Sequence, residues 1–344
     1  MDKVASEDLE IIDAHAHVLR SADHGRELWS YFLGRGPASG HPAEPPAVHT
    51  VEEAERLMDA TGVASMNILM FTWSGKYWRD GQYTLPDDAS RRAVAAEDLR
   101  RRIVGRIIEN NEWAVSTVAA HPRLTTFCGI DPAVMTRDEL VAEVTDKTAR
   151  GAIGVKFVPH DSRVSGDDRR LWPVLELLAA AGIPMLSEAS GRPGAPGRPA
   201  RYRDALVDFP DLKLIFAHLG HDPVFGQGAD AEVADLAQEF GGVHTDLSLR
   251  LPEMLNGACT PEAFVAHLRL IGTDRVLYGT NFGFLDTINR DPDHRPEDGP
   301  QITWARRNLQ AFLDLPLQDE ERVAIASANW KRVTSRAGST APAR

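Results

Sequence analysis

The sequence predicts a parallel (β/α)8 barrel, and two observations carry this prediction. Eight short apolar stretches alternate with segments of helical periodicity, and no linker interrupts the series. No predicted strand is followed by a glycine-rich dinucleotide fingerprint or a phosphate loop, which disfavours the main alternative, an open doubly wound sheet. A barrel gathers the carboxyl ends of its strands at one mouth, so reactive side chains are expected at those ends.

The first predicted strand covers residues 9–13 and ends at two histidines, His15 and His17. The other seven strands are predicted at 63–71, 124–130, 153–158, 183–188, 212–218, 243–247 and 275–280. Apolar residues at helical spacing predict helices at 51–60, 87–120, 138–149, 168–181, 231–240, 261–270, 301–314 and 318–334. Gly62 is expected to end the first of these helices.

The predicted barrel domain spans residues 9–335, between an N-terminal tail at 1–8 and a C-terminal tail at 336–344. Two loop insertions are expected, at 21–50 and at 72–90. The first is rich in glycine, proline and histidine, and we expect His24, His41 and His49 in it to be solvated. The second carries Trp73 and Trp78, which we expect to wall a substrate pocket, or else to pack over the barrel rim or against a partner subunit.

Composition excludes several classes of protein. Fifty acidic and 38 basic residues in a chain of 344 give a net charge of −12, which argues against a broad nucleic-acid-binding surface. No stretch approaches the roughly 20 apolar residues that a membrane span needs. Cys128 and Cys259 are too few for a disulfide scaffold or a cysteine-rich zinc module. We therefore expect a cytoplasmic protein with a small-molecule partner and with neither nucleic acid nor membrane as partner.

His15 and His17 form the first candidate site. Side chains alternate along a strand, so residues two apart point to the same face. Two imidazoles side by side at a strand end suit a divalent metal ion. The alternative is a loop with two solvated histidines.

Polar side chains also follow the later strands. A charged group in an apolar strand is rarely buried without a partner or a metal, so these positions predict one functional mouth. Lys156 could instead snorkel to the rim or pair with Glu188. The candidates are Lys156 and His160 at strand four, Glu188 at strand five, His218 and His221 at strand six, His244, Asp246 and Ser248 at strand seven, and Asn281 at strand eight.

Several separated motifs resemble one known family. The chain contains, in this order, IIDAHAH, NNEWAVSTVAAHPRLTTFCGIDP, GAIGVKFVPH, FPDLKLIFAHLGH, DRVLYGTNF and IASANWKRV. Together they resemble the amidohydrolase-related (amidohydrolase 2) branch of the metal-dependent amidohydrolase superfamily, which includes aminocarboxymuconate-semialdehyde decarboxylase and the resorcylate decarboxylases. The resemblance spans roughly residues 10–335.

The resemblance implies a distorted (β/α)8 barrel that binds one divalent metal ion, zinc as the first choice and manganese as the second. The metal-binding histidine pair of the family falls on His15 and His17, and its strand-six acid/base or electrophile falls on His218. Two positions depart from the family pattern. Glu188 stands where a third histidine ligand is expected, and Asn281 stands where the family has an aspartate. A homodimer, common in the family, is also possible.

These two departures leave the formal charge of the ligand set unchanged, because one carboxylate is gained and one is lost. His15, His17 and Glu188 would form a reasonable ligand set, with Asn281 adding a weak amide oxygen or a hydrogen bond. An amide cannot act as a base at neutral pH, so Glu188 or His218 would have to act as the catalytic base of a hydrolase.

The leading functional hypothesis is a metal-dependent hydrolase that cleaves a small carboxylated or cyclic amide- or ester-like substrate with metal-activated water. In it, His218, Glu188 and Asn281 serve catalysis, and substrate is bound by Lys156, Trp73, Trp78, His160 and His221. Arg192, Arg198 and Arg201 could also bind a substrate carboxylate. The second hypothesis is a non-oxidative decarboxylase of a small aromatic or unsaturated acid. The third is a barrel that has lost catalysis and acts as a binding protein.

Overall fold

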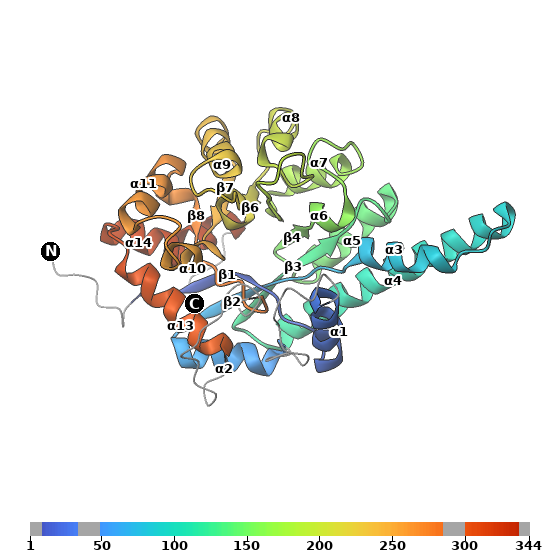
Figure 1. Ribbon diagram of the computed structural model, residues 1–344, viewed down its shortest axis with the longest axis horizontal. Helices are drawn as coiled ribbons and strands as arrows, with labels where there is room; N and C mark the ends of the chain where they lie inside the picture. The colour runs from blue at the N-terminus through green and yellow to red at the C-terminus, as the bar shows by residue number, and fades with distance from the viewer. Residues whose placement is uncertain (1–8, 34–48, 285–299, 337–344) are drawn as a thin grey trace. The chain divides into compact units, whose positions relative to one another are not determined.

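The computed structural model describes residues 9–33, 49–284 and 300–336 of the chain. Its eight strands form one sheet in which each strand neighbours the next in the sequence, and helices flank them, so the predicted (β/α)8 barrel is confirmed (Figure 1). The strands are β1 Ile12–Ala16, β2 Ser65–Leu69, β3 Leu124–Ile130, β4 Gly154–Phe157, β5 Met185–Ser187, β6 Leu214–Phe216, β7 Val243–Asp246 and β8 Val276–Leu277.

Most helices lie where the sequence predicts them. These are α2 Val51–Thr61, α4 Ala89–Ala120, α5 Arg137–Ala149, α7 Trp172–Ala181, α9 Gly228–Glu239, α11 Pro261–Ile271 and α13 Pro300–Asp314. Gly62 ends α2 in the left-handed conformation, with φ of 77°, as expected. Among the described residues, helices that the sequence did not predict are α1 Ala22–Leu33, α3 Ser74–Gly81, α6 Pro159–Ser162, α8 Arg203–Asp208 and α10 Arg250–Leu255.

The expected loop at 21–50 is wrong for its first part, because α1 occupies Ala22–Leu33. The glycine- and proline-rich composition that suggested a loop begins only at Gly34. Residues 34–48, which include His41, lie outside the described residues, as do the tails 1–8 and 337–344.

The expected loop at 72–90 is also largely helical, since α3 and the 3₁₀ turn Gln82–Thr84 fill its centre. Two buried carboxylates from other parts of the chain hold the start of α3. The Ser74 hydroxyl donates to Asp131, and the Gly75 N–H donates to Asp161 Oδ2 at 2.8 Å. Asp161 thus supplies a partner for one backbone N–H of the first turn, which has none within the helix, and Asp131 holds the Ser74 side chain. Tertiary contacts therefore stabilise a helix that local sequence does not signal.

Contacts within the chain divide it into two compact units. The first comprises Met1–Leu69, Pro122–Thr125 and Asp246–Trp330, and the second comprises Met70–His121, Thr126–Thr245 and Lys331–Arg344. Among the described residues, no helix is long and apolar enough to cross a membrane.

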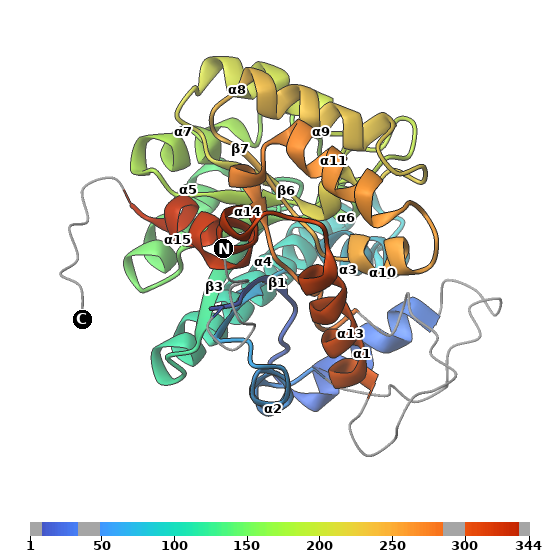
Figure 2. The same ribbon diagram turned by 90° about the vertical axis from the view of Figure 1, so that its left-hand side faces the viewer.

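In the first unit, β1 and β2 run parallel, and their register shifts between Asp13 and Ala16. Such an irregularity re-aims side chains, and here it falls at His15. Helix α2 packs against β2 and α13, and α2 and α13 lie side by side in both views (Figures 1 and 2). Leu57 and Met58 of α2 are both fully buried and belong to the core of this unit.

The predicted helix at 318–334 contains a π-helical segment, Ala324–Ala328, between α14 Asp319–Val323 and α15 Asn329–Thr334. A π segment breaks the regular hydrogen-bond ladder. The Ile325 carbonyl accepts from the Tyr278 N–H at 3.0 Å, and the Asn329 side chain donates to the Val276 carbonyl at 2.8 Å. The IASANW motif therefore anchors β8, the strand that leads to Asn281.

In the second unit, β3 to β7 pair in parallel without a register shift. Gly154 on β4 lies against the Phe127 ring, where a Cβ atom would come within 2.5 Å of the ring carbons. Helix α4 is the longest described helix, and α3 packs against it (Figure 1).

Candidate metal centre

His15 and His17 are both buried at the end of β1, in the first unit. The Nε2 atoms of the two rings lie 3.2 Å apart, and the ring planes cross at 77°. The structure thus brings the two side chains together, as their spacing predicts. The alternative of two solvated histidines is wrong.

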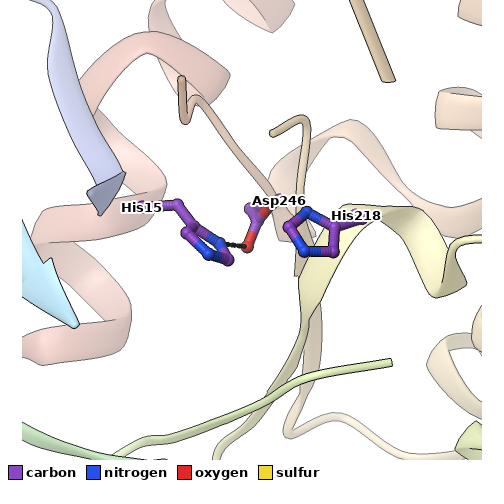
Figure 3. Close-up of side chains that lie close together, drawn as sticks. All are labelled: His15, His218 and Asp246. Atoms are coloured by element: carbon purple, nitrogen blue, oxygen red, sulfur yellow. Dashed lines mark hydrogen bonds and ion pairs between the residues drawn. The ribbon is translucent and has the colours of Figure 1, made fainter. Parts of the chain in front are cut away.

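Each ring donates through Nδ1 to a fixed acceptor. His15 Nδ1 lies 2.8 Å from Asp246 Oδ2 (Figure 3). His17 Nδ1 lies 3.2 Å from the Leu69 carbonyl. Because a carboxylate and a carbonyl only accept, Nδ1 carries the proton in both neutral rings. Both Nε2 atoms are then unprotonated and direct their lone pairs toward one another.

Two lone pairs that face each other at this distance repel unless a proton or a metal cation lies between them. The tautomers are those that metal-binding histidines adopt, with the far nitrogen held by a carboxylate or carbonyl. The donor set therefore fits a divalent metal ion.

Asp246 lies at the end of β7 and is fully buried. Its second oxygen, Oδ1, accepts from the Ser248 N–H at 3.0 Å and from the Ser248 hydroxyl. The Ser248 Oγ also lies 3.0 Å from His15 Nδ1. The carboxylate is thus fixed from one side by Ser248 and fixes His15 from the other. The sequence placed Asp246 and Ser248 at a strand end, but it did not predict that they orient a metal-binding histidine.

Asp13 joins the start of the site to β8. It accepts from the His15 N–H and from the Thr280 N–H, both at 3.0 Å, and from the Thr280 hydroxyl. Burial raises the pKa of Asp13 to about 6, against the lowering effect of these hydrogen bonds.

Two glycines leave room for the histidine pair. A Cβ atom on Gly279 would lie 2.9 Å from His15 Cβ, and one on Gly283 would lie 2.9 Å from His17 Cβ and 2.6 Å from its carbonyl oxygen. Gly283 also has a φ of +98°, which side chains rarely adopt. The segment GTNFG, residues 279–283, therefore needs glycine at both of its ends to make room for His15 and His17.

Asn281 lies between these glycines and is buried. Its backbone has a φ of +62°, and its N–H donates to the His15 carbonyl at 2.8 Å. Asparagine tolerates this left-handed conformation better than most residues. The structure thus places Asn281 beside the backbone of His15, in the first unit.

In the second unit, His218 follows β6 and is buried. His218, also drawn in Figure 3, begins a run of four residues with positive φ that ends at His221. The rings of His218 and His221 meet edge to face, 5.3 Å apart. Non-glycine residues in this conformation cost conformational energy, and such strain clusters at functional sites. The structure therefore brings these two predicted site residues together.

Glu188 directly follows β5 and is half-buried. Its Oε2 accepts from the backbone N–H of His160 at 3.1 Å, so the carboxylate bridges the segments after β4 and β5. The His160 side chain itself is exposed, while Lys156 on β4 is buried. His244 on β7 is buried as well, and its Nδ1 lies 3.0 Å from the Gly242 carbonyl.

Trp73 and Trp78 lie at and within α3, and both are half-buried. The Trp73 ring meets Phe71 edge to face, 5.1 Å away. Arg79 of the same helix pairs with Asp161 at 3.1 Å, which adds to the contacts of Asp131 and Asp161 at its first turn. The segment 72–90 with Trp73 and Trp78, called here the aromatic insertion, thus contains a helix that is held by residues following β3 and β4.

Other expectations are corrected. His49 is buried rather than solvated, and burial lowers its pKa to about 4. Its ring packs edge to face on Phe282, 5.7 Å away. In the arginine loop, Arg198 pairs with Glu232 and Arg201 with Asp167, so both guanidinium groups have protein carboxylates as partners.

A (β/α)8 barrel whose first strand ends in two convergent imidazoles defines a class of metal-dependent barrel enzymes. The amidohydrolase family model matches residues 12–333, and the chain belongs to this family. It is accordingly an enzyme of the amidohydrolase superfamily. Among curated proteins, none matches the chain.

Solved structures share the fold at low sequence identity. An uncharacterized TIM-barrel protein from Bordetella bronchiseptica is 18% identical, with 94% of this chain and 98% of that chain covered and a TM-score of 0.64. The 5-carboxyvanillate decarboxylase from Sphingomonas paucimobilis is 17% identical, with 95% and 99% covered and a TM-score of 0.57. The 2,6-dihydroxybenzoate decarboxylase from Rhizobium is 14% identical, with 95% and 98% covered and a TM-score of 0.57.

Proposed function

We propose that this protein is a divalent-metal-dependent decarboxylase of a small aromatic or unsaturated acid. The observation that carries the metal assignment is the convergence of the Nε2 atoms of His15 and His17, 3.2 Å apart, with both Nδ1 atoms engaged. We assign Glu188 and Asn281 as additional oxygen ligands. The ion is zinc as the first choice and manganese as the second.

A divalent ion held by His15 and His17 would supply Lewis-acid chemistry, that is, it would withdraw electron density from a substrate acid. The protein must then hold the substrate, exclude water and deliver one proton to carbon. In the reaction, the bond between the ring or vinyl carbon and the carboxylate breaks. Carbon dioxide leaves, and the electron pair that remains on carbon takes the proton.

We assign proton delivery to His218, because it is buried and an imidazole can give a proton near neutral pH. We assign His221, whose ring packs against His218, to orienting that imidazole and to contacting the substrate. Buried Lys156 is assigned to the substrate carboxylate or an adjacent hydroxyl oxygen. Trp73 and Trp78 on the clamped helix α3, and His160 beside Glu188, complete the proposed binding residues.

The identity of residue 281 favours decarboxylation over hydrolysis. An amide cannot take a proton from water at neutral pH, so Asn281 cannot be the base that hydrolysis uses. Decarboxylation needs a proton donor and no such base. Two of the similar solved structures are decarboxylases of hydroxylated aromatic acids, which supports the same choice.

Hydrolysis of a small carboxylated or cyclic amide- or ester-like substrate is the second candidate, and the family match supports it. A metal ion lowers the pKa of bound water to about 7, so a weak base is sufficient to take the proton from that water. His218 or Glu188 would then carry the proton to the leaving group.

An assay with metal-reconstituted enzyme separates the two reactions. The enzyme is offered a panel of hydroxybenzoic and unsaturated acids, with release of carbon dioxide as the readout, and a panel of amides, lactones and esters, with release of acid. We expect metal-dependent carbon dioxide release that is lost in His218→Ala and retained in Asp88→Asn, a remote surface variant. Cleavage of an amide, lactone or ester without carbon dioxide would instead establish the hydrolase.

A further inference from the structure

A left-handed turn follows β6 in the second unit. The φ angles of His218, Leu219, Gly220 and His221 are 60°, 55°, 106° and 56°. The His221 N–H donates to the His218 carbonyl at 2.8 Å, which closes the turn. The left-handed conformation is unfavourable for residues with a side chain, and it persists only where the surrounding structure imposes it. The left-handed turn therefore depends on contacts from outside it.

Two aspartates join the end of the left-handed turn to the start of α9. The Asp222 N–H donates to Asp230 Oδ1, and the Ala229 N–H donates to Asp222 Oδ2, both at 2.9 Å. The other carboxylate oxygens accept as well. Asp230 Oδ2 accepts from the Gly226 N–H at 2.9 Å, and Asp222 Oδ1 accepts from the Val224 N–H at 3.1 Å. Because a carboxylate is charged, such bonds to backbone N–H groups are stronger than those between neutral groups.

Helix α9 takes a capping oxygen from this connection. Within the described part of the chain, its N-cap residue Gln227 forms no side-chain capping hydrogen bond. The Asp222 carboxylate instead accepts from the Ala229 N–H in the first turn of the helix. The Asp230 side chain, which belongs to that same first turn, is fully buried. A residue beside the left-handed turn thus caps the helix, and a residue of the helix holds the turn.

The backbone of the left-handed turn also fits closely against two neighbouring segments. A Cβ atom on Gly220 would lie 2.5 Å from the Ala229 carbonyl oxygen of α9. In the loop after β5, the Gly191 N–H donates to the His221 carbonyl at 3.1 Å, and a Cβ atom on Gly191 would clash with Asp222 Cα. These close contacts on two sides leave the backbone that carries the two imidazoles little freedom to move.

We propose that Asp222 and Asp230 are positioning residues for His218. They hold the left-handed turn on α9, so the His218 imidazole keeps its place and its edge-to-face contact with His221, 5.3 Å away. This inference rests on the proposed role of His218 in delivering a proton to carbon. A displaced proton donor slows the chemical step, while substrate binding changes less.

Asp222→Asn and Asp230→Asn test this role. An amide keeps one acceptor but turns an N–H₂ group toward the other backbone N–H, so each variant loses one hydrogen bond. Asp222→Asn is the milder change, because the Asp222 side chain is 11% exposed whereas Asp230 is fully buried. Asp235→Asn is the matched control, since Asp235 is an exposed aspartate on the same helix. Circular dichroism confirms that each variant is folded.

The first measurement is NMR of the zinc-reconstituted protein with its histidines labelled, and the His218 signals are identified by their absence in His218→Ala. We expect these ring signals to shift, and the contact between the ring protons of His218 and His221 to weaken, in Asp222→Asn and Asp230→Asn but not in Asp235→Asn. The second measurement is the rate of carbon dioxide release. We expect kcat to fall by about 10- to 100-fold in the first two variants, with a much smaller change in KM.

Folded variants whose His218 signals match those of the wild type would overturn the proposal, even if their activity fell. Shifted signals with an unchanged kcat would overturn it as well. If Asp230→Asn does not fold, the milder Asp222→Asn decides by the same criteria. A wild-type enzyme that releases no carbon dioxide from any acid would refute the proposed reaction, while the His218 signals would still decide whether the two aspartates position the ring.

Discussion

At the scale of single residues, the central feature is the pair of hydrogen bonds that fixes the two imidazoles of the site. His15 is held by a fully buried carboxylate, Asp246, and His17 is held by a backbone carbonyl, that of Leu69. A carboxylate raises the basicity of the ring more than a carbonyl does. His15 should therefore be the stronger of the two ligands, and its strength should depend on Asp246.

Asp246→Asn is predicted to weaken metal binding by about 10–100-fold, because loss of such a partner typically has this effect on a metal site. The amide can also present its N–H₂ to Nδ1, which would favour the tautomer with the proton on Nε2. Isothermal titration of the metal-free protein with zinc gives the affinity, and nitrogen NMR of the His15 ring gives the tautomer. Asp131→Asn, a change to a buried aspartate in the other unit, is the control and should bind metal normally. An unchanged affinity and tautomer in Asp246→Asn would contradict the orienting role.

Gly283→Ala is predicted to destabilise the protein and to reduce metal binding. The new methyl group would approach the His17 carbonyl oxygen to within 2.6 Å, at a φ of +98°. Gly151→Ala is a matched control, since Gly151 has a φ of +116° but nothing within 4 Å of its Cβ position. We expect Gly283→Ala to cost roughly 1–3 kcal/mol more unfolding free energy than Gly151→Ala, through steric conflict. Denaturant unfolding measures both, and equal costs would show that His17 is not crowded.

At the scale of elements, the aromatic insertion is organised by buried carboxylates. Asp131, which follows β3, accepts from the Ser74 hydroxyl at the start of α3 and from the Ala133 N–H at 2.8 Å. Asp161 holds the next residue of the helix and Arg79 further along it. The position of Trp73 and Trp78 therefore depends on polar contacts made by residues far away in the sequence.

Asp131 should leave a signature in the pH dependence of stability. Burial raises its pKa to about 6, from 3.8 in the unfolded chain. Between these values the folded protein keeps a proton that the unfolded chain loses, so this contribution to stability falls as the pH rises from about 4 to above 6. The fall amounts to about 3 kcal/mol, the equivalent of about two pKa units. The unfolding free energy of wild type relative to Asp131→Asn should decrease over this window.

Asp88→Asn is the control for this titration. Asp88 caps α4, and hydrogen bonds from Ser90 and Arg91 lower its pKa. The sign is opposite, so wild type should gain stability relative to Asp88→Asn as the pH rises. If the Asp131→Asn difference also grew with pH, the carboxyl group of Asp131 would not be buried as described.

At the scale of the whole molecule, the sequence predicts the barrel because each strand and most helices carry a local signal. The apolar run before His15, the glycine after α2 and the period of α4 are such signals. The helix α3 has no comparable signal, because its start is held by two residues far away in the sequence: Asp161 accepts from the Gly75 N–H, and Asp131 accepts from the Ser74 hydroxyl.

The residues of the candidate site likewise fall into those that the sequence predicts and those that depend on contacts between distant residues. The spacing of His15 and His17 places both rings on one side of β1, so the sequence alone predicts that they meet. The role of Asp246 depends on a contact between residues 231 positions apart, and the burial of His49 depends on Phe282. Periodicity carries no information about such contacts. A polar residue at the end of a predicted strand, as Asp246 is, was the available signal.

His15 and His17 together are proposed to hold one divalent ion. Mass spectrometry of protein purified without added metal, and again after reconstitution with zinc or manganese, measures the metal content of the chain. We predict about one ion per chain in the wild type and in Asp88→Asn, and a loss of the ion in both His15→Ala and His17→Ala, with all variants folded by circular dichroism. A wild-type chain that takes up no metal after reconstitution, or retention of the metal in both His15→Ala and His17→Ala, would show that these two histidines do not hold an ion.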